Sequence, residues 1–139
     1  MNLSKLTVAT QVPCQAIHPE KYSPSASIGA SLLLDLLKLT SINIVHYPFE
    51  TFCCGSSMLQ YDERIAYDIA KKRINSLIKH KVNAITMGCG NCSMNYTVHQ
   101  SEYTEINLAT LFFSEILDYA LGTSYDKIDV LLKNKNERE

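Results

Sequence analysis

Five cysteines are the residues whose types and spacing could carry chemistry in this chain of 139 residues. They are Cys14, the adjacent pair Cys53 and Cys54, and the C-x-x-C pair Cys89 and Cys92. Thiolates are soft ligands that suit Zn²⁺, Cu⁺ and iron–sulfur clusters, and two cysteines spaced as C-x-x-C can chelate one metal from a single turn. The cysteines therefore indicate a metal or iron–sulfur centre.

The number of thiols bears on which metal would bind. Side chains of adjacent residues diverge, so Cys53 and Cys54 suit two different atoms better than one ion. A mononuclear zinc site takes four ligands and would leave one cysteine over, whereas a cluster of several irons could use all five. Gly55, Gly88 and Gly90 would let the backbone approach such a group, although turn formation explains each glycine nearly as well.

Composition and charge exclude several classes of protein. A net charge of −1 and a single short basic cluster, residues 71–73, argue against nucleic-acid binding. No apolar run reaches the roughly 18 residues that a membrane span needs, and residues 1–12 lack the apolar stretch of a secretory signal. We therefore expect a cytoplasmic protein, with recruitment to a membrane complex left open. In that reducing compartment an odd number of cysteines favours metal binding or redox catalysis over structural disulfides.

Stretches with the apolar period of strands alternate with stretches that have the period of helices. We predict strands at residues 3–10, 43–47, 82–87 and 105–108, and helices at residues 28–39, 62–80, 91–102 and 109–121. The alternation predicts an α/β fold, a small three-layer domain with a parallel sheet of about four strands flanked by helices. We expect one domain over residues 1–122, ended by Gly122 as a helix cap, and an extension over residues 123–139 with a small apolar cluster and a frayed tail.

Two of the predicted helices carry further information. In the helix at residues 62–80, acidic residues begin the helix and basic residues end it, and five apolar residues share a face: Ile65, Ile69, Ile74, Leu77 and Ile78. The helix at residues 28–39 is apolar except for one narrow polar stripe. It packs either between the sheet and the C-terminal segment or against a partner, and both interpretations stay open.

The predicted strands bring the cysteines to one edge of the sheet. Cys14 follows the first strand, Cys53 and Cys54 follow the second, and Cys89 follows the third, with Cys92 one helical turn beyond. In an open parallel sheet, ligands bind outside the carboxyl ends of the strands. We therefore expect the metal site at this carboxyl edge.

The order of these residues resembles the cysteine-rich CCG domain family. Cys14 is followed after 38 residues by Cys53-Cys54-Gly55, and then after 33 residues by Cys89-Gly90-Asn91-Cys92. The similarity extends through nearly the whole chain to Gly122. The family includes the B subunit of heterodisulfide reductase and related subunits of lactate, glycolate, glycerol-3-phosphate and succinate oxidoreductases.

The resemblance implies a noncubane [4Fe-4S] cluster ligated by Cys14, Cys53, Cys54, Cys89 and Cys92, or in some copies of the domain a zinc site that uses four of them. It implies a heterodisulfide reductase-like redox subunit that passes electrons to a disulfide or related acceptor. Because the sequence has no dinucleotide fingerprint and no ferredoxin-type cysteine run, the electron donor would be a flavoprotein or ferredoxin-like protein on another chain. Family members usually carry two such domains, so the second would come from another subunit or a homodimer, or be unnecessary.

Two other interpretations remain. A zinc-bound structural or assembly module of an oxidoreductase complex, without turnover of its own, would leave one cysteine dispensable. A thiol–disulfide pair at Cys89 and Cys92 leaves the other three cysteines unexplained. Whether the chain is itself an enzyme is left open.

Polar residues near the cysteines have both a functional and an ordinary interpretation. His18 and His46 could reach the site as proton donors, and Ser56 and Asn91 could hydrogen-bond to cluster sulfur. Loop, strand and turn roles explain these residues at least as well.

Overall fold

The computed structural model describes residues 2–14, 26–103 and 108–136. Its centre is a four-stranded parallel sheet in the order β2-β1-β3-β4. The strands are β1 Thr7–Gln11, β2 Asn43–Val45, β3 Ala84–Met87 and β4 Ala109–Phe112. The α/β fold with a parallel sheet of four strands is confirmed.

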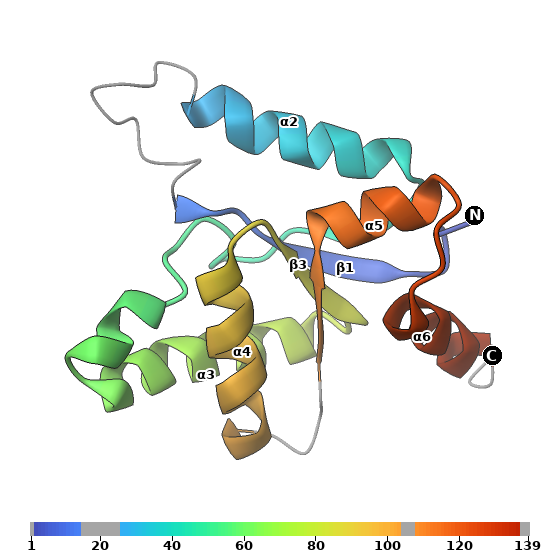
Figure 1. Cartoon of the computed structure of the whole chain (residues 1–139). Helices are drawn as coiled ribbons and strands as arrows, with labels where there is room; N and C mark the ends of the chain where they lie inside the picture. Colours follow the sequence, from blue (N-terminus) through green and yellow to red (C-terminus); the bar gives the residue numbers. More distant parts are fainter. Residues whose placement is uncertain (1, 15–25, 104–107, 137–139) are drawn as a thin grey trace.

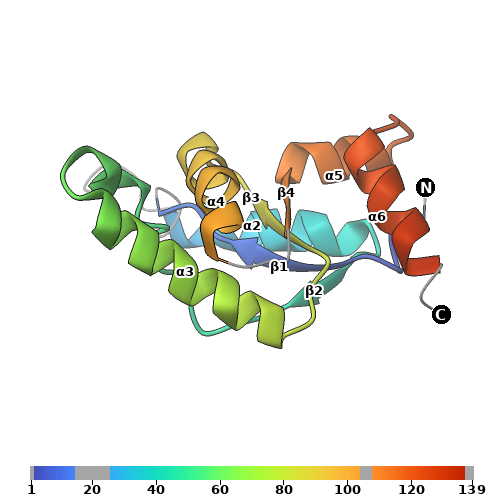
Figure 2. The ribbon, with the colours of Figure 1, turned by 90° about the horizontal axis from the view of Figure 1, so that it is seen from below.

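The helices lie on both faces of this sheet, as Figures 1 and 2 show. Within the described residues they are α2 Ala26–Leu39, the 3-10 helix η1 Ser56–Gln60, α3 Glu63–Lys79, α4 Gly90–Tyr103, α5 Phe113–Ala120 and α6 Asp126–Asn136. Helices α2, α5 and α6 pack into one buried apolar cluster, and α3 and α4 pack into the other. The two clusters on opposite faces make the domain three-layered.

The strands form because their side chains enter both clusters. Val8 belongs to the core beside α2 and α5, and the next residue, Ala9, belongs to the core beside α3 and α4. Strand β3 is buried along its whole length. Strands that are covered on both faces have nearly continuous apolar sequences, whereas strands with one solvent-exposed face alternate apolar and polar residues.

Helix α3 confirms the predicted helix at residues 62–80. Asp62 is the N-cap, and its carboxylate accepts a hydrogen bond of 3.0 Å from the Arg64 backbone N–H. The predicted apolar face is partly wrong, because Ile65 is exposed. Ile74 and Leu77 belong to the buried face as predicted. The other members of that face are Ala66, Ala70 and Arg73.

The predicted boundaries after residue 104 are wrong. The last strand is β4, Ala109–Phe112, where a helix was predicted, while residues 105–107 of the predicted strand lie outside the described residues. The helix begins only at Phe113, because the Glu115 carboxylate accepts a 2.7 Å hydrogen bond from the Phe112 backbone N–H and so caps the new helix. Gly122 follows α5 with a φ of 115°, as a helix-ending glycine requires.

The segment after Gly122 contains a helix that the sequence analysis did not predict. Helix α6 buries Ile128 completely, and Leu131 and Leu132 pack against the same core. The spacing of these three residues is that of one helical face. Residues 137–139 of the predicted frayed tail lie outside the described residues.

Helix α2 buries one side and exposes the other. Leu37 is fully buried in the core that includes α5 residues, whereas Leu32, Leu36 and Leu39 are 54%, 42% and 81% exposed. Leu36 and Leu39 line a surface hollow together with Leu117 and Leu121 of the α5 region. None of the described helices is long and apolar enough to cross a membrane.

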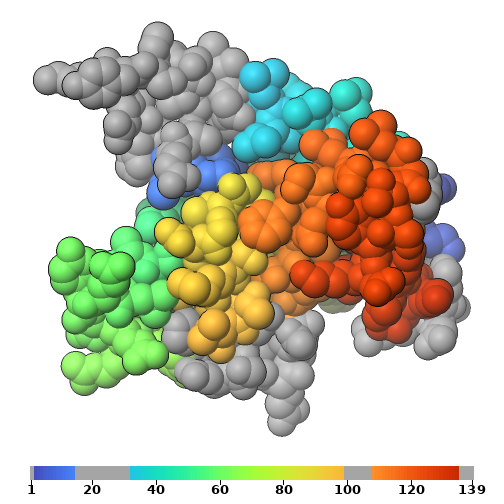
Figure 3. All heavy atoms as spheres, in the orientation of Figure 1, coloured from blue at the N-terminus to red at the C-terminus, as the bar shows by residue number. Residues whose placement is uncertain are grey.

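The strand order places a topological switch at the centre of the sheet. From β1 the chain moves outward to β2, and it then returns past β1 to β3 and continues to β4. The connections leave β1 and β3 in opposite directions, and in open α/β sheets ligands bind at the carboxyl ends of the strands at such a point. In the space-filling view, α4 lies between α3 and the β4–α5 segment on the side where β3 ends (Figure 3).

Candidate metal centre

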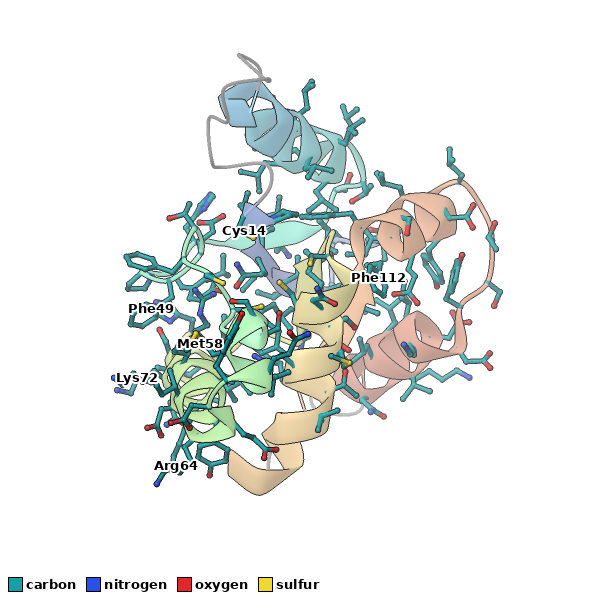
Figure 4. All side chains as sticks on the ribbon, turned by 60° about the vertical axis from the view of Figure 1, so that its left-hand side comes forward. Cys14, Phe49, Met58, Arg64, Lys72 and Phe112 are labelled. Atoms are coloured by element: carbon teal, nitrogen blue, oxygen red, sulfur yellow. The ribbon has the colours of Figure 1, made fainter. Side chains whose placement is uncertain are left out.

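Three strand ends carry the five cysteines. Cys14 comes three residues after β1, the Cys53–Cys54 pair follows β2 through the turns at residues 48–52, and Cys89 comes two residues after β3. Cys92 lies in the first turn of α4. Figure 4 shows Cys14 near the end of β1.

Three of the five thiols are linked, in the sense that they lie close enough to act on one another's acidity. Cys54 and Cys92 are each only 3% exposed, and each shifts the pKa of the other. Cys89, which is half-buried, also acts on the pKa of Cys92. The described structure thus brings together one cysteine of the adjacent pair and both cysteines of the C-x-x-C segment.

The remaining two cysteines are placed differently. Cys53 is exposed, and its sulfur accepts a weak contact of 3.4 Å from the Gly55 backbone N–H. Cys14 is half-buried. The five cysteines all lie within the described ranges, where none of them forms a disulfide and no group of three or more His, Cys, Asp and Glu side chains is arranged to hold a metal ion.

The linked thiols differ in acidity. The Cys92 thiol beside Cys54 holds the pKa of Cys54 below its usual value, and Ser56 and the Arg73 charge act in the same direction, although burial opposes them. The contact with Cys54, together with burial, raises the pKa of Cys92. The closeness of the two thiols therefore disfavours a state in which both are thiolates.

The turn of the cysteine pair is tied to α4 by a residue that the sequence analysis did not single out. Asn95 is completely buried, and its Nδ2 donates a 2.8 Å hydrogen bond to the Cys54 carbonyl oxygen. Its Oδ1 has no partner among the described residues. Asn95 follows Cys92 by three residues, so the helical period could have placed both on the same face.

A buried polar network lies beneath the same turn. Arg73 is 2% exposed, and its Nη1 donates to Gln11 Oε1 and, over 3.2 Å, to the Tyr96 hydroxyl. Gln11, the last residue of β1, donates from Nε2 to the Phe52 carbonyl oxygen at 2.9 Å. The network joins β1, α3 and α4 to the residue just before the cysteine pair.

A hollow of about 310 Å³ opens beside Cys53. Apolar side chains make most of its wall, and Phe49 and Phe52 meet edge to face with 6.0 Å between ring centroids. The lining residues are Phe49, Phe52, Cys53, Ile69, Lys72 and Arg73. Figure 4 shows Phe49 and Lys72 on the same side of the molecule.

The other residues proposed from the sequence have varied positions. His46 is exposed and contacts Glu50 through Nδ1 at 2.8 Å, and Asn91 is exposed in the first turn of α4. Ser56 does lie at the site, where its side chain and backbone help to lower the pKa of Cys54. His18 lies outside the described residues.

Comparison with known proteins agrees with the cysteine pattern. The sequence model of the family described as CCG, cysteine-rich domain, matches residues 8–97. The chain is also similar to the B subunit of ferredoxin:CoB-CoM heterodisulfide reductase from Methanosarcina mazei, with 24% identity over 135 residues. That alignment covers 90% of this chain and 44% of the relative, so the chain spans less than half the length of the curated protein that it matches.

Proposed function

The chain belongs to the cysteine-rich CCG domain family, and we propose that it is a redox subunit that binds a noncubane [4Fe-4S] cluster and passes electrons to a disulfide or related acceptor. The proposed ligands are Cys14, Cys53, Cys54, Cys89 and Cys92. The observation that carries the proposal is the contact between Cys54, Cys92 and Cys89, which come from segments far apart in the sequence. Soft thiolates from three strand ends suit iron and inorganic sulfide.

The polar groups around the cysteines also suit an anionic metal–thiolate group. Tyr47 Oη, Arg73 Nη2 and Asn95 Oδ1 are buried without a hydrogen-bond partner among the described residues. Orphaned buried polar atoms are uncommon in folded proteins and call for an explanation such as a missing ion or group. Tyr47 and Arg73 can both donate hydrogen bonds to sulfur.

The residues of the chain would hold and orient this group. Asn95 fixes the Cys54 carbonyl, and Ser56 helps to lower the pKa of the Cys54 thiol. A bound cluster would supply one-electron transfer and iron atoms that a substrate sulfur can approach. Because Cys53 is exposed and lines the hollow with Phe49 and Lys72, we propose that the acceptor approaches from this side.

The proposed reaction needs a partner. Reducing one disulfide to two thiols takes two electrons and two protons, and the electrons would come from a flavoprotein or ferredoxin-like protein on another chain. The proposal takes residues 1–122 as the cysteine-rich domain and residues 123–139 as an extension. A second domain of this kind would be supplied by another chain or by a homodimer.

A zinc-binding structural or assembly module is the second candidate. The observation that favours it is the position of Cys53, which is exposed and contacts its own turn rather than the three linked thiols. Zinc needs four ligands, so this function leaves one cysteine dispensable, and Cys53 is the one we expect.

Metal analysis separates the two functions. Protein purified without oxygen is analysed for iron, sulfide and zinc, and each cysteine is replaced by serine in turn. We expect about four irons and four sulfides per chain, with losses in all five variants. About one zinc per fully loaded chain, no iron, and full metal retention in Cys53→Ser would overturn the cluster and support the zinc module.

A further inference from the structure

Arg73 is a buried cation without a carboxylate partner in the described part of the chain. Its side chain is 2% exposed, yet none of the ion pairs found among the described residues includes it. Glu50, the acidic residue near this turn, instead contacts Thr10 and His46. Because transferring a charge from water into a protein interior is costly, buried charges are normally paired.

The groups that do contact Arg73 are neutral. Its Nη1 donates to Gln11 Oε1 and the Tyr96 hydroxyl. Its Nη2 has no partner of hydrogen-bond geometry among the described residues, and the Tyr47 phenol lies near enough to feel the guanidinium charge. Burial raises the pKa of Tyr47 to about 12 and raises that of Tyr96 as well, so both phenols are protonated at neutral pH. The tyrosines therefore do not supply the missing negative charge.

The cysteines are the nearby groups that can supply it. Arg73 shares the hollow beside the cysteine pair with Cys53, and Gln11, which accepts from Arg73, donates to the carbonyl of Phe52 just before the pair. Four or five thiolates around Zn²⁺ or an iron–sulfur cluster carry a net negative charge. In a buried setting, a nearby cation stabilises such a group much more than it would in water.

We propose that Arg73 is the counter-charge of the metal–thiolate centre and thereby sets how tightly the cysteines hold a metal. This role rests on the proposed function only in requiring that the cysteines bind a metal, and it applies to zinc as well as to a cluster. For a cluster, Arg73 would also raise the reduction potential, because the reduced state carries one more negative charge.

The proposal predicts opposite effects of one substitution in two states. Arg73→Met keeps much of the apolar stem and removes the charge. We expect the metal-free, reduced variant to be as stable as wild type or more stable, because an uncompensated buried charge is gone. We expect the loaded variant to lose at least tenfold in metal affinity, measured by competition with a chelator. Arg73→Lys keeps the charge and should retain most of the affinity.

Two controls separate charge from architecture. Lys71→Met removes an equal charge from an exposed neighbour on the same helix, and should leave metal affinity unchanged because exposed charges are screened. Tyr96→Phe removes two hydrogen bonds from the network without changing charge, and should also leave the affinity within a few-fold of wild type. If a cluster is present, its midpoint potential should fall in Arg73→Met; a tenfold change in a one-electron equilibrium corresponds to about 59 mV.

The outcomes identify which idea fails. Wild-type protein that binds neither zinc nor iron ends the proposed function. Wild-type protein that binds metal, with unchanged affinity in Arg73→Met, ends the counter-charge role alone. The counter-charge role would also be overturned if metal-free Arg73→Met unfolds, or if Tyr96→Phe loses as much metal affinity as Arg73→Met. Either result would mean that Arg73 acts by holding the hydrogen-bond network together.

Discussion

The turn after the cysteine pair offers a sharp test, because Gly55 has a φ of 87° and very little space beside it. A Cβ at this position would lie 3.0 Å from both Cβ and Cγ2 of Ile69 on α3. A distance of 3.0 Å is tighter than nine in ten real Cβ contacts, and a change of side-chain rotamer cannot move the Ile69 Cβ, because the backbone of α3 fixes its position. Gly55→Ala therefore adds a steric clash to an unfavourable backbone conformation.

The size of the effect follows from these two costs. Left-handed backbone costs a residue with a Cβ about 1–2 kcal/mol, and overpacking a well-filled site costs about 1–3 kcal/mol. Together they give a loss of about 2–5 kcal/mol in the free energy of unfolding for Gly55→Ala. Gly122→Ala is the matched control, since Gly122 has a φ of 115° but no atom within 4 Å of an added Cβ. It should lose only about 1–2 kcal/mol.

Urea unfolding of the reduced, metal-free protein measures both variants. The difference between them isolates the contact with Ile69 and should be about 1–3 kcal/mol. If Gly55→Ala is no less stable than Gly122→Ala, then the turn has room to move and the close packing of the cysteine pair on α3 is refuted. A loaded sample adds a second readout, because a displaced turn should reduce the amount of metal bound per chain.

Three further predictions concern neighbouring residues. Asn95→Ala should lower the free energy of unfolding by about 1–3 kcal/mol, because the buried Cys54 carbonyl loses its donor; exposed Asn91→Ala should stay within about 0.5 kcal/mol of wild type in the same urea titration. In wild type, burial raises the pKa of Tyr47 from 10 to about 12, so stability should fall as pH rises from 10 to 12, and Tyr47→Phe should remove on the order of 2–3 kcal/mol of that fall. Gly90→Ala should keep metal-free stability or raise it by about 0.4–1 kcal/mol, because nothing lies within 4 Å of a Cβ added at this position. The same variant should lower metal uptake if the bound group uses this space.

Each of these predictions has a clear contrary result. Equal stability of the two asparagine variants would mean that the hydrogen bond to Cys54 contributes nothing. Parallel alkaline unfolding curves for wild type and Tyr47→Phe would mean that the phenol is not held protonated. Full metal uptake by Gly90→Ala would place the bound group away from the start of α4.

The sequence was sufficient for the parts of the fold that have strong local signals. Asp62 and the acidic first turn predicted the beginning of α3, and β2 and β3 lie within the ranges predicted for them. Strand β1 begins at Thr7, four residues later than predicted, because residues 4 and 5 form a turn. Strand β4 was misplaced because no turn residue separates Phe112, its last residue, from Phe113, the first residue of α5. The signal that ends the strand, the Glu115 cap, acts from within the helix.

Two residues at the site, Arg73 and Asn95, were not predicted from the sequence. Arg73 belongs to the basic cluster at residues 71–73, which predicts an exposed surface, yet its spacing from Ala66, Ala70 and Leu77 puts it on the buried face of α3. Periodicity was the better guide here than charge. The hydrogen bond from Asn95 to Cys54 depends on tertiary packing between two segments, and no local pattern encodes it.

The central position of β1 has a consequence for how a metal could enter. Thr7–Gln11 pairs with β2 on one side and with β3 on the other, and both partners come much later in the chain. Such non-local parallel pairing forms slowly, because long loops must close before the contacts stabilise them. During synthesis Cys14 therefore emerges well before β3 can bring Cys89 and Cys92 beside it. If the chain binds the proposed metal centre, metal insertion would then be a late event, after the sheet has closed, and Cys14 would have to stay reduced until that moment.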